Sequence, residues 1–495
     1  EEKNASLTGA SYYTYYYYYK FINNCNNLIR IIDPAVASET SLHNLGCALT
    51  FRALCYLDMA RLFEFMPTGY AYYDNEATAT GIWGLTVPIV SDKTPAEQLD
   101  KNPRAPFTTM YRFILNDLNQ AERFLAGYNR PVGSYPDQSV VYGMQARLWL
   151  EMATRFDTEN KNERGVQDAE RDLKAQLAME GCNDGYADLG VTTATECYAK
   201  AADYARKAQA AYTPMTQYEW QHPTTGFNTA TNSWMLFSRV STQEQEAYYY
   251  STMLGVICTE ATWGMPQYGG GNYRCIGEYL YSKLPDTDWR KTSWLAPDDA
   301  TLAASSIKIK NKQKRDEVFN ALRSKYNSSS TDTIFSRFPA YANFKFRTRD
   351  ASDMIEGLKC DLPLMRVEEM YFIEAEAEAH LNGAASGAAL LQKFVSAHRD
   401  ASYVCKASDL KGFTDEMMLQ KRVEFWGEGI CFFDYKRLRL PVQRSRNSNY
   451  PSDMRHDSKD GYVCPAMNYY ILNYEINNNP AVVGNPDCTK WNEKK

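Results

Sequence analysis

The stretch RVEEMYFIEAEA, residues 366–377, is the part of this 495-residue chain that most strongly predicts its fold. It lies within a segment, 362–382, whose pattern predicts a helix, and two more helices are expected over 386–400 and 413–429. The last of these ends in a second charged run, R-x-E-F-x-x-E-G, at residues 422–429. The helical part of the C-terminal half is therefore expected to cover 362–440.

Both stretches carry charged residues at helical spacing. The first has a run of glutamates that falls on several faces of a helix, which favours a solvated or ion-paired surface: Glu368, Glu369, Glu374, Glu376 and Glu378. The second has opposite charges three or four residues apart, a spacing at which side chains on a helix pair: Arg422, Glu424, Glu428, Asp434 and Arg437. We expect this second set to hold a helix to its neighbour rather than to catalyse a reaction.

Toward the N-terminus, helical spacing recurs in successive segments. Tyrosines crowd the start of the first segment, from Tyr12 to Tyr19, and cover every face of a helix, so some must stay partly exposed. From Leu42 to Phe63, apolar residues recur at steps of three and four, and this helix is expected to end before Pro67. Further helices are expected over 107–127, 138–155 and 196–212. The N-terminal scaffold is thus predicted over 10–66, 107–156 and 196–212.

Two regions lack this spacing and are expected to face the ligand. The first, 67–106, is rich in glycine and aromatic residues. The second, 213–361, is too long for one ordinary loop, so it forms either a small separate domain or an irregular face on the helices. A polar insertion at 157–195 is expected to be a solvated excursion. We predict a mainly α single domain, 1–495, in which helix pairs form an irregular array with a large loop-rich face.

The composition excludes several classes of protein. Lys and Arg number 54 against 60 Asp and Glu, a net charge of −6, and no long basic run is present, so nucleic acid is not an expected partner. None of the 12 cysteines forms Cys-x-x-Cys, the spacing of zinc ribbons and redox motifs. No apolar run reaches the roughly 18 residues of a membrane span. The 37 tyrosines and 9 tryptophans suit binding of carbohydrate, peptide or protein surfaces.

The usual catalytic motifs are also missing. The sequence contains no phosphate-binding P-loop, dinucleotide fingerprint, His-Glu-x-x-His or Gly-x-Ser-x-Gly. We therefore expect no cofactor and no metal ion, and predict no catalytic residue. A glycosidase needs only two carboxylates at a suitable separation, which a sequence does not show, so that activity remains an alternative.

The two C-terminal stretches resemble the SusD/RagB family of nutrient-binding lipoproteins of Bacteroidetes. Residues 366–377 are similar to the family's Arg-Leu-x-Glu-Val-Tyr-Leu-Ile-x-Ala-Glu-Ala helix. Residues 422–437 are similar to its Arg-x-x-Glu-Leu-x-x-Glu-Gly-x-Arg-x-x-Asp-Leu-x-Arg region. Further matches, in the same order as in the family, are residues 51–67, the run GLTVPI at 84–89 and Asp288-Trp289-Arg290.

The resemblance implies both a fold and a function. The fold is a right-handed array of tetratricopeptide-like helix pairs with a variable, loop-rich face. Members are held on the external face of the outer membrane by an N-terminal lipid, which would lie outside this chain. They bind oligo- or polysaccharides and pass them to a TonB-dependent SusC-like transporter, and they are not enzymes.

Residues of the candidate binding site are chosen by chemistry and position. Sugar rings need exposed aromatic platforms beside polar side chains, carried on loops of a rigid scaffold. The loop after the helix that ends before Pro67 offers Tyr70, Tyr72, Tyr73, Asp74, Asn75 and Trp83. The loop around a triple glycine, 269–271, offers Trp263, Gln267, Tyr268, Asn272 and Tyr273.

Two other functions remain open at this point. A peptide-binding RagB-like protein would favour polar loops that satisfy a peptide backbone over flat aromatic platforms, and the surplus of Tyr and Trp favours glycans. A secreted glycoside hydrolase is opposed by the missing motifs and by the resemblance.

Overall fold

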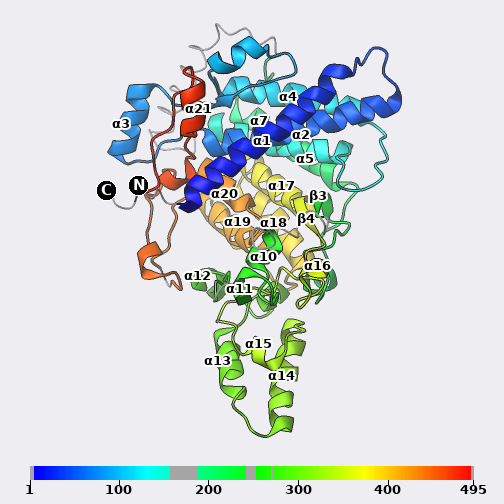
Figure 1. Ribbon diagram of the computed structural model, residues 1–495, viewed down its shortest axis with the longest axis vertical. Helices are drawn as coiled ribbons and strands as arrows, with labels where there is room; N and C mark the ends of the chain where they lie inside the picture. The colour runs from blue at the N-terminus through cyan, green and yellow to red at the C-terminus, as the bar shows by residue number, and fades with distance from the viewer. Residues whose placement is uncertain (1–4, 157–186, 241–251, 269–270, 447, 492–495) are drawn as a thin grey trace.

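The structure is a computed structural model that describes residues 5–156, 187–240, 252–268, 271–446 and 448–491. Most elements are helices (Figure 1). The greater part of the predicted polar insertion, 157–186, lies outside the described residues. Of the helices within these ranges, none is both long enough and apolar enough to cross a membrane.

The scaffold is a series of helices in which each packs on the next along the chain. The first four members are α1 (Ala5–Ile31), α2 (Glu39–Phe63), α4 (Phe107–Phe124) and α5 (Gln138–Phe156). The series continues through α7 (Ala194–Gln209), α17 (Val367–Asn382), α18 (Ala384–His398), α19 (Leu410–Glu424) and α20 (Ile430–Arg437). Most of these helices lie within a few residues of their predicted ranges, but α17 begins later than predicted, α19 ends earlier, and α20 was not predicted as a separate helix.

Helix α5 lies at the centre of the scaffold and is buried along almost its whole length, from Val140 to Arg155. Helix α7 packs against it and begins with a capping box, in which Thr193 and Glu196 satisfy each other's backbone N–H groups. A Cβ on Gly143 would lie only 2.4 Å from the sulfur of Met365, so this glycine allows the neighbouring strand to approach α5 closely.

The tyrosines at the start of α1 are partly buried and partly exposed, as their number on one helix predicts. Tyr15 is buried against Phe63 of α2, whereas Tyr12, Tyr13, Tyr16 and Tyr17 are each about half exposed. The exposed rings stack in pairs at helical spacing, Tyr12 on Tyr16 and Tyr13 on Tyr17. The sequence prediction that part of this run stays exposed is confirmed.

One predicted helix begins later than its sequence suggests. Residues 360–366 form strand β4 (Cys360–Arg366), which pairs antiparallel with β3 (Trp234–Val240), placing Arg366 opposite Trp234. Helix α17 therefore starts at Val367, and the prediction of helix from residue 362 was wrong for this first part. A second small sheet pairs β1 (Leu85–Pro88) with β2 (Arg104–Pro106).

The two regions predicted as loops contain short helices. The first holds α3 (Ala71–Thr80) and the 3-10 turn η1 (Ala96–Lys101). The second holds α8 (Gln217–Gln221), α10 (Met253–Ile257), α11 (Met265–Tyr268), α12 (Glu278–Ser282), η3 (Trp289–Ser293), α15 (Asp332–Phe335) and α16 (Met354–Gly357). Apolar spacing is difficult to detect over only four to ten residues, which is why the sequence did not reveal them.

The second region also contains a helical hairpin that projects from the scaffold, at the bottom of Figure 1. It consists of α13 (Pro297–Ser306) and α14 (Lys312–Tyr326). A cluster of aromatic rings fills its base, including Phe319, Phe335 and Phe344. This hairpin was not predicted.

The C-terminal segment returns to the end of α2. Asn468 accepts from the backbone N–H of Met66 at 3.1 Å and donates to its carbonyl at 2.7 Å, while the N–H of Tyr469 donates to the carbonyl of Leu62 at 3.1 Å. The remaining short elements of this segment are η4 (Ser452–Met454), η5 (Pro465–Met467) and α21 (Asn473–Asn478). The segment thus lies beside the first predicted loop region.

Candidate functional site

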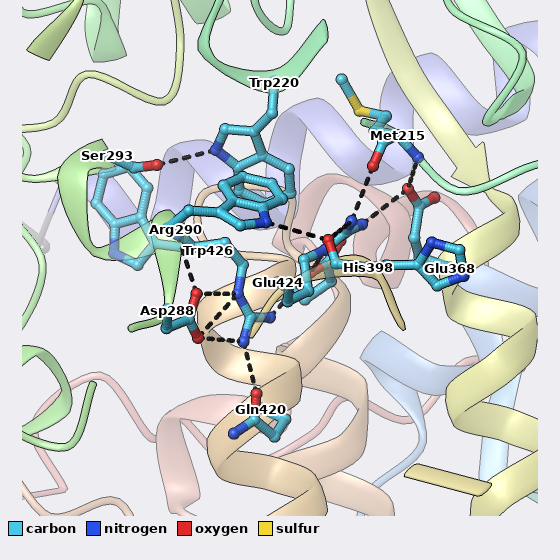
Figure 2. Close-up of polar contacts among 12 residues, drawn as sticks. Met215, Trp220, Asp288, Arg290, Ser293, Glu368, His398, Gln420, Glu424 and Trp426 are labelled. Carbon is cyan, nitrogen blue, oxygen red and sulfur yellow. Dashed lines mark hydrogen bonds and ion pairs between the residues drawn. The ribbon is translucent and has the colours of Figure 1, made fainter. Parts of the chain in front are cut away.

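Charged residues of the two C-terminal stretches meet in a buried ionic network centred on Glu424 (Figure 2). The Arg399 guanidinium donates to both Glu424 oxygens, at 2.8 and 2.9 Å, and Arg290 donates to one of them at 3.0 Å. Arg290 in turn pairs with Asp288 at 2.7 Å and donates to Gln420 at 2.6 Å. Burial opposes the charged form of Glu424, but Arg399, with Arg366 and Arg290, lowers the pKa of this carboxyl well below its ordinary value.

Other members of the two charged sets are equally enclosed. Glu428 accepts from Arg366 at 2.8 Å and from Lys345 at 2.6 Å. Arg437 pairs with Glu376 at 2.5 Å and with Asp434 at 2.7 Å. The predicted structural role of these residues is confirmed: the charges join α17, α19 and α20 to strand β4 and the Asp288 turn. They are buried and mutually neutralised, so this network is not the ligand site.

The glutamate run of α17 divides between the interior and the surface. Glu368, Glu369 and Glu376 are buried and ion-paired. Glu374 and Glu378 lie nearer the surface and pair with Arg206 of α7, at 3.5 and 3.0 Å. The expectation of an ion-paired surface holds, and a solvated one does not, because α17 is covered by α5, α7, α18 and α19.

The first group of predicted site residues is only partly exposed. Tyr70, Tyr73 and Trp83 are buried in one cluster with Phe65 and Cys488, so their rings offer no open face to a sugar. The Asp74 carboxylate accepts the backbone N–H groups of Thr68 and Gly69, each at 2.9 Å, and so shapes the loop that follows α2. Tyr72, at 54% exposure, and Asn75 are accessible on α3.

The second group shows the same division. Trp263 is buried, and its ring N–H donates to the carbonyl of Asp350 at 3.1 Å. Gln267 donates to the carbonyl of Thr259 at 3.0 Å, and Tyr273 packs edge-on against Phe338. Tyr268, at 71% exposure, and Asn272 face solvent. Two of the three glycines expected to shape this loop, at 269 and 270, lie outside the described residues.

A large groove lies beside α12, α19 and α20. It has two adjoining chambers of about 930 and 360 Å³, a size typical of small-ligand sites. The residues that line both chambers are Tyr279, Arg422, Tyr435, Pro441, Gln443 and Arg446. They come from α12, α19, α20 and the segment that follows α20, and we call them the groove wall.

The groove adjoins both predicted loops. Asp460 and Gly461 line the larger chamber, and nearby Lys459 donates to the carbonyl of Gly69, at 2.6 Å, in the first loop. Cys275 and Gly277, which line the smaller chamber, follow directly on the second loop. None of the predicted site residues lines either chamber, so their role in binding stays a prediction.

The segment that closes the groove is held by a set of short contacts. The backbone N–H groups of Arg444 and Ser445 donate to Asp457, at 2.8 and 3.0 Å. Asn449 bridges to α12: its side chain accepts from the N–H of Glu278 at 3.1 Å and donates to the carbonyl of Ile276 at 3.0 Å. The segment is thus fixed to the element that carries Tyr279.

Cations and aromatic rings alternate along the groove. The guanidinium of Arg446 lies 4.8 Å from the centre of the Tyr279 ring, that of Arg422 5.9 Å from Tyr435, and that of Arg444 5.2 Å from Tyr450. Each arginine is held over or beside a ring by cation–π attraction, with its donors open to the groove.

Arg422 corrects one sequence prediction. It was grouped with the ion-paired residues, but among the described residues no carboxylate lies within ion-pair distance of it. Its neighbour Glu424 points into the network, while Arg422 lines both chambers. A signal for the wall was present in RLRLPVQRSR, residues 437–446, a basic run broken by proline and followed by Asn, Ser and Tyr.

Within the ranges that the structure describes, no cluster of three or more His, Cys, Asp or Glu side chains is arranged to hold a metal ion. The imidazole of His380, which borders the larger chamber, stacks on Tyr198 at 4.1 Å between ring centres.

Comparison with known proteins decides the family. The sequence pattern of the SusD family matches residues 198–487, more than half of the chain. The chain belongs to the SusD family. None of the curated proteins that were compared is similar enough in sequence to count as a relative.

Solved structures of SusD-like proteins share the fold. A SusD-like carbohydrate-binding protein from Bacteroides vulgatus is 20% identical, with a TM-score of 0.64 over 97% of this chain and 88% of that one. A SusD superfamily protein from Bacteroides thetaiotaomicron is 16% identical, with a TM-score of 0.59 over 96% and 84%. One from Parabacteroides distasonis is 15% identical, with a TM-score of 0.58 over 96% and 85%. The predicted fold, a SusD-like array of helix pairs, is confirmed.

Proposed function

We propose that this SusD-family protein captures an oligo- or polysaccharide at the cell surface and delivers it to a TonB-dependent SusC-like transporter, without breaking a bond. The observation that carries the proposal is the groove wall, in which the rings of Tyr279 and Tyr435 lie beside Arg422, Gln443 and Arg446. Tyrosine rings suit the C–H faces of sugars, and the amide and guanidinium groups suit their hydroxyls. The related fold of a carbohydrate-binding protein from Bacteroides vulgatus agrees with this chemistry.

The family also supports a location for the protein. We propose that it sits on the external face of the outer membrane through a lipid attached N-terminal to the segment described. Reversible capture suits this position, because weak sites gain from repeated engagement by a polymer.

The accessible residues of the two predicted loops extend the site in this proposal. Tyr72 and Asn75 are exposed on α3, and Tyr268 and Asn272 are exposed a few residues before Cys275, which lines the smaller chamber. The buried members, Tyr70, Tyr73, Trp83 and Trp263, then act by supporting these loops, as do Asp74, Gln267 and Tyr273 through their contacts.

Affinity electrophoresis tests this function. The native protein is run through gels that contain plant, host and microbial polysaccharides, beside Tyr279→Ala, Trp83→Ala and Trp263→Ala variants. The proposal expects retardation of the wild type by at least one polysaccharide, and loss of retardation in Tyr279→Ala. Absence of retardation in every gel would contradict glycan capture and favour a peptide ligand. Release of sugar on incubation would contradict capture without catalysis.

A further inference from the structure

We infer that the groove selects glycans that carry acidic groups, carboxylate or sulfate, over neutral ones. This inference rests on the proposed function and specifies its ligand class. It comes from the charge of the groove wall: among the described residues that line both chambers there are two arginines and no carboxylate.

Apart from the buried Arg439, which lines only the larger chamber, the lysines and arginines of the groove fall into two sets. Lys411 and Arg437 are neutralised, by Asp415 at 2.7 Å and by Glu376 at 2.5 Å. By contrast, Lys283, Arg422, Arg444 and Arg446 line the groove and, in the part of the chain that is described, have no carboxylate within ion-pair distance.

The acidic residues of the groove lie outside the wall that its two chambers share. Asp415 pairs with Lys411, and Glu416 accepts a hydrogen bond from Tyr403 at 2.7 Å. Glu278 lines only the smaller chamber and Asp460 only the larger one, so neither belongs to the wall between them. The wall shared by the two chambers thus carries the charges of two arginines and no carboxylate, within a protein whose net charge is −6.

The geometry around the arginines suits an anionic sugar. A guanidinium presents paired N–H donors that match a carboxylate or a sulfate, and such charge-assisted bonds are stronger than those to hydroxyls. Arg446 lies beside Tyr279, and Arg422 beside Tyr435. A sugar ring stacked on either tyrosine would thus place a ring substituent near a guanidinium.

The overall negative charge sharpens the selection. The net charge of −6 disfavours the approach of an acidic polymer, whereas the two arginines of the groove wall attract it, so the groove becomes the favoured point of contact. Arg446, which lines both chambers, and Arg444, which lines the smaller one, are exposed to solvent and its salt, so binding should weaken as ionic strength rises.

Titration calorimetry against matched glycan pairs tests this inference. The probes are fragments of uronate-containing polysaccharides with their carboxyl-reduced counterparts, and fragments of sulfated polysaccharides with their desulfated counterparts. We expect at least one acidic fragment to bind roughly tenfold or more tightly than its neutral counterpart. The uronate and sulfate series distinguish the two acidic groups.

Variants locate the effect. Arg422→Gln and Arg446→Gln should each remove most of the preference for the acidic fragment, and a folded Arg446→Gln protein is expected because this side chain is exposed on a loop. The matched control is Arg349→Gln, an exposed arginine that lines neither chamber, which should bind as the wild type does.

Each outcome has a defined meaning. Equal or tighter binding of the neutral fragments, or an unchanged preference in both groove variants, overturns the inference and leaves glycan capture standing. Absence of binding to every fragment, acidic and neutral, overturns the inference together with the proposed function.

Discussion

Arg290 and Glu424 form an ion pair of 3.0 Å between side chains that are both fully buried, and 134 residues separate them in the sequence. Arg290 belongs to the turn η3 in the loop-rich region, and Glu424 ends α19 of the scaffold. The pair therefore fixes the irregular middle of the chain to the C-terminal helices. Arg399 and Arg366 pair with the same carboxylate. Loss of the Glu424 charge would therefore remove an ion-pair partner from three buried arginines.

The first prediction concerns the stability that this network provides. Glu424→Gln keeps the shape of the side chain and removes its charge, so we expect the free energy of unfolding to fall by about 3–5 kcal/mol. Urea denaturation followed by circular dichroism measures the change. The control is Asp316→Asn, which breaks an exposed pair with Lys312 on α14 and should cost no more than about 0.5 kcal/mol. A loss below about 1 kcal/mol in Glu424→Gln would show that the network is not central to the fold.

The second prediction concerns acid. The pKa of Glu424 is lowered in the folded protein because the arginines around it outweigh the effect of burial. Its stabilising contribution is therefore fully present above the ordinary pKa of a glutamate, about 4.3, and is lost as the pH falls toward the lowered folded value. We expect the stability gap between wild type and Glu424→Gln to be constant from about pH 7 to 5.5 and to narrow at pH 3.5. A gap that widens in acid would contradict this assignment.

The third prediction concerns the aromatic part of the groove. Tyr279→Ala should weaken binding of the preferred glycan by about 0.5–1.5 kcal/mol, or roughly two- to twelvefold in Kd, because the stacking surface is removed. Tyr279→Phe keeps the ring and should stay closer to the wild-type affinity. Calorimetry provides the comparison, with Tyr218→Ala, an exposed tyrosine outside the groove, as control. Equal losses in the Ala and Phe variants would assign the effect to the hydroxyl instead.

The fourth prediction separates buried from exposed residues of the predicted loops. Trp83 is buried and also donates to Thr78 at 3.2 Å, so Trp83→Ala should lower the free energy of unfolding by about 3–5 kcal/mol. Tyr268→Ala should change stability by less than about 0.5 kcal/mol, because the side chain is largely exposed. Thermal unfolding measures both variants. If Trp83→Ala is as stable as the wild type but binds glycan more weakly, the structural role is contradicted and Trp83 contacts the glycan directly.

The helices of the scaffold could be predicted because their signal is local. In α2 the apolar residues of one face recur at steps of three and four, and that pattern needs no partner to be recognised. Strand β4 was missed because its state depends on β3, whose residue Trp234 pairs with Arg366 from a distant part of the chain. The hairpin of α13 and α14 was hidden for another reason: its buried residues are few, and its aromatic base is completed by Phe335 and Phe344 from outside the two helices.

The candidate site shows where sequence reasoning reaches its limit. Residues two apart on a helix point in different directions, so Glu424 enters the network while Arg422 faces the groove. The charge pattern of the sequence does not show which of these two side chains is buried and which faces solvent. Trp83 has the composition and loop position of a binding residue, yet it is covered in a cluster that includes Cys488, from the other end of the chain. Burial of this kind follows from tertiary packing, which the local sequence does not contain.

The most direct test is a crystal structure of the protein with the glycan that retards it most strongly in affinity gels. The account predicts sugar density in the groove, with a ring against Tyr279 or Tyr435 and an acidic group within hydrogen-bonding distance of Arg422 or Arg446. Density for the glycan elsewhere on the molecule, with the groove unoccupied, would contradict it.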